Sequence, residues 1–159
     1  MDDLQKAEES GAGMTGTLEF TSACYYRYAA LNLTLLFGTK KKPGHLAVLA
    51  DDERRKVVDA FLRAALLAVP NARKNSMNAN TVPAYVLGTL KENGQPIQLV
   101  NAFESPVRAK GDGLVKDSIA ALEAEHKKLK DTWGVTFAAE CRIPEKSLET
   151  FCAGLLAGL

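Results

Sequence analysis

The sequence contains few of the residues from which metal centres and disulfide frameworks are built. Its three cysteines, Cys24, Cys141 and Cys152, lie far apart, and each is set among apolar residues. Because no two of them form a CxxC pair, neither a zinc site nor a disulfide framework is indicated, and we expect buried, reduced thiols in a cytosolic protein. The sequence therefore predicts no metal, no cofactor and a cytoplasmic location.

Long apolar runs and a targeting segment are also missing. The first ten residues, MDDLQKAEES, are acidic and polar, which does not fit the n-region of a signal peptide. No apolar run reaches the length that spans a bilayer, so no membrane partner is expected. The formal net charge is only +1, and the overall charge thus neither favours nor excludes a nucleic-acid partner.

Catalytic signatures are absent as well. The chain contains no GxSxG, HExxH or P-loop motif. It has two histidines: His45 lies in a Pro-Gly segment, and His126 falls on the apolar stripe of a predicted helix, where a hydrogen-bonded core imidazole is the simpler interpretation. We therefore predict that the protein is not an enzyme and has no catalytic residues.

A stretch without proline or interior glycine runs from residue 16 to residue 33 and is rich in aromatic side chains. Its alternation predicts the central strand of a half-covered sheet, with Tyr26 and Tyr28 on the apolar face. Tyr25 and Arg27 fall on the other face and are ambiguous. A base-stacking platform made of residues 25–28 is the alternative to this core interpretation.

Periodicity predicts the remaining elements of an α+β fold. Helices are expected over 51–69, capped by Asp51 or Asp52, and over 114–132 and 144–156, with Pro144 in the first turn of the last one. Strands are expected over 84–92, 95–103 and 135–143, the first two joined as a hairpin by an Asn-Gly pair. This order predicts a single domain with an antiparallel or mixed sheet and helices on one face.

Two basic, polar segments are the main candidates for binding. Residues 71–83 contain Arg73, Lys74, Asn75 and Ser76, and residues 104–113 contain Arg108 and Lys110. Cationic, amide and hydroxyl donors of this kind suit phosphate and ribose oxygens, although ordinary surface loops have the same composition. The three lysines of segment 38–44 are most simply a solvated bend, with an anion site as the alternative.

Three stretches together resemble one known family. They are GAGMTGTLEFTSACYYRYAALNLTLL, FLRAALLAVPNARKNSMNANTVPAYVLGTL and QPIQLVNAFESPV, and their order and spacing agree with that family. By this resemblance the chain is similar to the C-terminal half of CasC, the backbone subunit of the type I-E CRISPR surveillance complex, Cascade. An RNA-processing endonuclease on a related RRM-like scaffold that uses His45 is a further alternative, but no histidine lies in a polar loop beside a nucleophile or phosphate motif.

The resemblance implies a partial RRM-like (ferredoxin-like) palm with helices on one face. Residues 1–16 would be a thumb-loop remnant, residues 17–143 the palm and its helices, and residues 144–159 the C-terminal helix. The N-terminal half of the palm would then be missing from this chain. The long strand would lack neighbours and expose an unpaired edge.

The resemblance also implies a function in antiviral defence. Such subunits bind CRISPR RNA without catalysis, polymerise along the guide and hold it for pairing with target DNA. The implied partners are the guide, target DNA through the guide, other copies of the chain, other Cascade subunits and a missing N-terminal half. Met14 and Thr15 would wedge beside a displaced nucleotide, and Arg73, with Lys74 and Asn75 adjacent, and Arg108 would bind RNA. The alternative is a structural fragment that self-associates through an exposed strand edge and binds no RNA.

Overall fold

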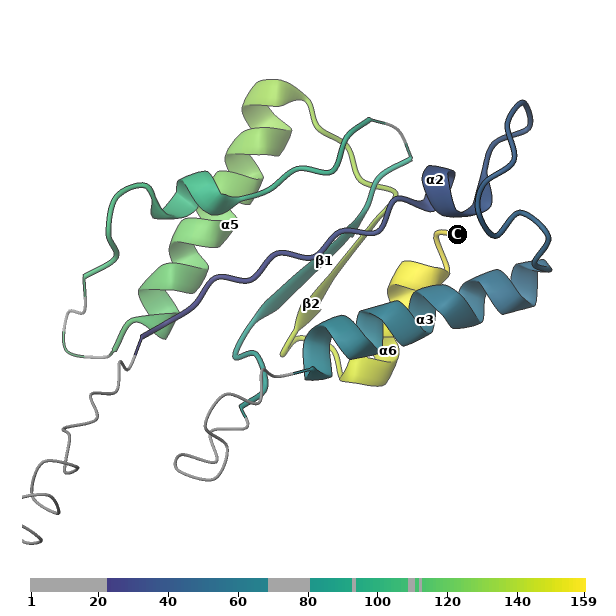
Figure 1. Cartoon of the computed structure of the whole chain (residues 1–159). Coiled ribbons are helices and arrows are strands. Elements are labelled where there is room, and N and C mark those ends of the chain that lie inside the picture. The colour runs from purple at the N-terminus through teal and green to yellow at the C-terminus, as the bar shows by residue number, and fades with distance from the viewer. Residues whose placement is uncertain (1–22, 69–80, 93, 109–110, 112) are drawn as a thin grey trace, which may run out of the picture.

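The structure is a computed structural model that describes residues 23–68, 81–92, 94–108, 111 and 113–159. These residues form a mixed α+β fold in which a two-stranded antiparallel sheet lies between helices (Figure 1). The elements in chain order are α2 (Leu33–Phe37), α3 (Asp51–Leu67), β1 (Val86–Leu90), the 3-10 helix η1 (Val100–Phe103), α5 (Val115–Trp133), β2 (Ala139–Ile143) and α6 (Leu148–Leu156).

The sheet pairs β1 with β2, with Val86 opposite Ile143 and Leu90 opposite Ala139. The predicted hairpin between 84–92 and 95–103 is therefore wrong, and only the C-terminal part of the predicted 135–143 strand, Ala139–Ile143, is a strand. Gly94 turns the chain at φ +83°, and Pro96 has no N–H to donate to a ladder. The chain leaves the sheet at this point and enters η1 instead of returning along β1.

One face of the sheet packs against α6 and holds the apolar core. Cys141, Phe151, Cys152 and Leu155 are buried there. Gly88 of β1 makes this close approach possible, because a Cβ at this position would meet the Phe151 ring and lie 2.8 Å from Leu155 Cδ1. Helix α6 begins at Leu148, not at Pro144 as predicted, because Ser147 caps it by accepting a hydrogen bond from the Thr150 N–H at 3.3 Å.

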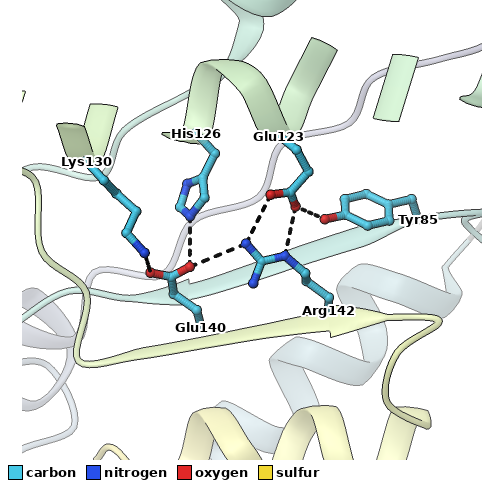
Figure 2. Close-up of polar contacts among 6 residues, drawn as sticks. All are labelled: Tyr85, Glu123, His126, Lys130, Glu140 and Arg142. Carbon is cyan, nitrogen blue, oxygen red and sulfur yellow. Dashed lines mark hydrogen bonds and ion pairs between the residues drawn. The ribbon is translucent and has the colours of Figure 1, made fainter. Parts of the chain in front are cut away.

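The opposite face of the sheet is polar and carries α5, so the prediction that helices lie on one face only is wrong. Glu140 and Arg142 of β2 point toward α5 (Figure 2). Arg142 Nε donates to Glu123 Oε1 at 2.8 Å, and the Tyr85 hydroxyl donates to the same carboxylate. Helix α5 matches the predicted 114–132 helix within a residue at each end.

Glu140 is the centre of this polar layer. It accepts hydrogen bonds from Lys130 Nζ at 2.6 Å and from His126 Nε2 at 2.9 Å (Figure 2). Burial alone would raise the pKa of Glu140, but the hydrogen bonds from Lys130 and His126 outweigh it and lower the pKa to about 2. His126 is only 3% exposed, and its contact with Glu140 fits the predicted role of a hydrogen-bonded core imidazole.

The described part of the predicted 16–33 strand is not a strand. Residues 23–32 are extended but belong to no strand, and helix α2 begins at Leu33, where Asn32 Oδ1 accepts the Leu35 N–H at 2.9 Å. Among the described residues no neighbouring strand pairs with this segment, so its side chains gain little burial. Tyr28 is 39% exposed and Cys24 is exposed, which corrects the prediction that both are buried.

Helix α3 confirms the most regular pattern in the sequence. It spans Asp51–Leu67 and buries Val58 on its apolar stripe. The predicted cap is wrong: the N-cap is Ala50, whose N–H donates to Glu53 Oε2 at 3.0 Å, and Asp51 instead pairs with Arg54 at 3.7 Å. Acidic residues in this first turn still favour the helix through its dipole.

Candidate nucleic-acid interface

The extended segment of residues 23–32 is attached to the C-terminal end of α3 through Arg27. Its guanidinium donates hydrogen bonds to the carbonyl oxygens of Ala68, at 2.9 Å, Leu66, at 3.2 Å, and Ala65. The last carbonyls of a helix have no partner within the helix, and a cation at this end also complements the helix dipole. Arg27 therefore serves as a C-terminal cap supplied from about forty residues away along the chain.

The neighbouring residue, Tyr26, attaches the same segment to η1. Its hydroxyl accepts the Leu99 N–H at 3.1 Å, and its ring is tilted against that of Phe103, with centroids 5.4 Å apart. Burial is the main cause that raises the pKa of Tyr26, so the hydroxyl is neutral at physiological pH. Because Tyr26 and Arg27 are adjacent and extended, they point to opposite sides of the segment and hold two different elements.

These two attachments bring together the points from which the predicted RNA-contact segments depart. Residue 23 follows the segment with Met14 and Thr15, Ala68 precedes the segment with Arg73, and Phe103 precedes the segment with Arg108. Figure 1 shows the extended segment running between α5 and η1 on one side and α3 on the other.

The predicted contact residues are described only in part. Arg108 is described and exposed to solvent. The others lie outside the described residues: Met14, Thr15, Arg73, Lys74, Asn75, Ser76 and Lys110. The structure thus brings the attachment points of the predicted segments together, and the contacts of the residues themselves stay predictions.

Fewer aromatic rings near this region are exposed to solvent than the sequence alone suggests. Tyr26 and Arg27 are engaged in contacts within the protein, so of residues 25–28 only Tyr25, at 78% exposure, and Tyr28 present their rings to solvent. The structural role of Arg27 was missed in the sequence. The only available signal was the alternation that places it opposite Tyr26, and nothing local identifies a helix end as its partner.

Other kinds of site find little support in the described part of the chain. No group of three or more His, Cys, Asp or Glu side chains there is arranged to hold a metal ion. His45 lies exposed in a turn after α2. Among the described residues, no helix is both long enough and apolar enough to cross a membrane.

Comparison with known proteins places the chain in a CRISPR context. The model of a Cas-associated family, described as CT1975-like protein, matches residues 1–152. The match extends from the first residue into α6 and includes every predicted RNA-contact residue. No curated protein matches the chain.

Proposed function

Because this chain belongs to the CT1975-like family of Cas-related proteins, its role is CRISPR-related, and we propose that it binds CRISPR RNA as a non-catalytic backbone subunit. In this proposal the protein is of the CasC type, part of a type I-E Cascade complex. Copies of it line the guide together with other Cascade subunits and hold it for pairing with target DNA. The described α+β core is then part of an RRM-like palm.

One observation carries the proposal: Tyr26 and Arg27 tie η1 and the end of α3, after which two of the candidate segments follow, to the extended segment of residues 23–32, which follows the third. Separate basic segments bind RNA weakly, because each alone neutralises only one or two phosphates. Segments that depart from fixed points of one fold bind more tightly than separate ones, because binding of one segment raises the effective concentration of the others at the RNA. A surface that follows a guide without reading its sequence needs this kind of contact to phosphate and sugar.

The charges at this surface also suit a ligand that is held and not cleaved. Arg108 is exposed, and an arginine binds phosphate oxygens with two parallel hydrogen bonds. The tyrosine rings of Tyr25 and Tyr28 are free to stack on bases, which adds affinity for any sequence. His126 is buried against Glu140 in the polar layer, and His45 is exposed in the turn after α2.

A salt titration with a labelled single-stranded guide RNA tests the proposal. Each phosphate contact to a single strand contributes about 0.7 to the slope of log affinity against log salt concentration. We therefore expect Arg73→Ala and Arg108→Ala each to lower the slope by about 0.7. Lys56→Ala, at an exposed position on α3, is the control and leaves the slope unchanged. The absence of RNA binding by the unmodified chain would refute the proposal.

The second candidate is self-association without RNA, and the extended segment favours it. Residues 23–32 have no strand partner among the described residues, and the sheet that is described has only two strands, a number that is marginal for independent stability. Light scattering after size exclusion separates the two functions. Oligomers whose size is the same with and without guide RNA would favour self-association.

A further inference from the structure

A basic turn lies at the other end of α3 from the candidate RNA surface. It comprises residues 38–44 and is closed by two backbone hydrogen bonds: the Thr39 N–H donates to Lys42 O at 2.8 Å, and the Lys42 N–H donates to Thr39 O at 3.3 Å. The Thr39 hydroxyl also accepts the N–H groups of Lys41 and Lys42, at 3.3 and 3.2 Å. The turn is therefore internally hydrogen-bonded and not a loose bend.

Two features hold this turn in place. Gly38 adopts φ +88° and pairs with Pro43 across the turn, and a Cβ on Gly38 would lie 2.6 Å from Lys42 O. Beyond the turn, Arg54 of α3 donates to Ala47 O and Leu49 O, each at 2.9 Å. The guanidinium of the same arginine lies 5.4 Å from the centroid of the Phe37 ring. The chain on both sides of the turn is thus fixed to the start of α3.

The turn carries three consecutive positive charges. Lys40, Lys41 and Lys42 are all exposed, and in the described part of the chain none of their ammonium groups forms a hydrogen bond or an ion pair. By contrast, Lys127 and Lys128 on α5 pair with Asp131 and Glu125. Three like charges on consecutive residues repel one another and attract a polyanion more strongly than scattered lysines do.

The chemistry of the turn points to a phosphate backbone. A lysine ammonium binds phosphate as a point charge and reads no base. The turn and the candidate RNA surface are separated by the length of α3, whose 17 residues span about 25 Å at 1.5 Å per residue. Figure 1 shows the turn projecting away from the body of the protein beyond α2. The contacts proposed at the other end of α3 therefore do not involve these lysines.

We propose that Lys40, Lys41 and Lys42 form a second nucleic-acid site that binds the phosphate backbone of double-stranded DNA. A duplex carries twice the charge per unit length of one of its strands, so it attracts a compact group of three lysines more strongly than a single strand does. Because the preformed turn already orders the backbone, binding orders only the lysine side chains. The site reads no sequence and does not require bound guide RNA.

The test uses the full chain without guide RNA and a fluorescein-labelled DNA duplex of random sequence. Fluorescence anisotropy at several KCl concentrations gives the affinity and its salt slope. Changing Lys40, Lys41 and Lys42 together to Gln is expected to weaken binding and to lower the slope by about 2 to 3, because each phosphate contact to a duplex contributes about 0.9. The matched control changes Lys116, Lys127 and Lys128 to Gln, which alters net charge equally, and is expected to leave most of the slope intact.

Three outcomes would overturn the proposal of a second site. Equal losses in both triple variants would show a bulk charge effect. An unchanged slope in the turn variant would show that the lysines do not contact DNA. Guide-RNA affinity measured in parallel is expected to be the same in the turn variant and the unmodified chain. A parallel loss of RNA affinity would place the turn on the guide's path and remove the second site. The failure of guide RNA to bind the unmodified chain would refute only the proposed function.

Discussion

The polar layer between β2 and α5 makes stability depend on pH in a specific window. Glu140 has its pKa lowered from an ordinary value of 4.5 to about 2, and its side chain is 19% exposed. A difference of this size corresponds to roughly 3 kcal/mol of stability. Because the folded protein binds this proton less tightly than the unfolded chain, the contribution is complete above about pH 5 and is lost as the pH falls from 4.5 toward 2.

Replacing Glu140 with Gln removes the titrating group and leaves Lys130 and His126 without a carboxylate. We expect the free energy of unfolding at pH 7 to fall by roughly 2 to 3 kcal/mol, and the gap between variant and unmodified chain to narrow as the pH is lowered to 3. Urea unfolding followed by far-UV circular dichroism at pH 7, 5, 4 and 3 measures this. Circular dichroism is preferable to fluorescence because Trp133 is 71% exposed and senses burial poorly.

The control for this experiment is Glu149→Gln. Glu149 forms a bidentate contact with Arg63, which lowers the pKa of the carboxylate, but its side chain is 72% exposed. Solvent screens a pair of this kind, so we expect a small effect at every pH. If the difference in unfolding free energy between Glu140→Gln and the unmodified chain stays constant from pH 7 to pH 3, the account of the polar layer is refuted.

Two further predictions concern packing and the interface. Gly88→Ala forces a methyl group into the Phe151 ring and is expected to cost about 1 to 3 kcal/mol of stability. A second change, Phe151→Leu, is expected to recover part of this loss. Equal stability of Gly88→Ala and the unmodified chain would contradict the described packing of α6 on β1. Arg27→Gln removes the donors that cap α3 and is expected to speed amide exchange in the last turn of that helix and to weaken guide-RNA binding. Unchanged exchange there would show that Arg27 does not hold the helix end.

The long helices could be predicted because their signal is local and repeats many times. Helix α3 shows an apolar stripe over several turns and ends close to Pro70, and α5 shows the same period up to Gly134, which adopts the left-handed conformation expected at a helix end. Strand pairing depends on distant residues instead. The Asn-Gly pair predicted a local hairpin, but β1 gains more by pairing with β2, whose Cys141 and neighbours bury against α6.

The candidate interface was predicted in its composition but not in its organisation. The sequence drew attention to Arg108 and to the segment with Arg73 because basic and polar residues cluster there. It did not predict that Arg27 caps a helix or that Tyr26 binds Leu99, because both contacts join residues far apart in the chain. Aromatic, β-compatible residues around Tyr26 indicated a strand, yet an extended segment becomes a strand only when another backbone pairs with it.

Photocrosslinking of a guide RNA that carries 4-thiouridine, followed by mass spectrometry of the attached peptides, tests the central claim most directly. The account predicts crosslinks in peptides that contain the extended segment of residues 23–32, the segment after α3 and the segment with Arg108, and none in α6. Crosslinks confined to α6 or spread evenly over the chain would contradict the claim that the protein holds RNA at the C-terminal end of α3.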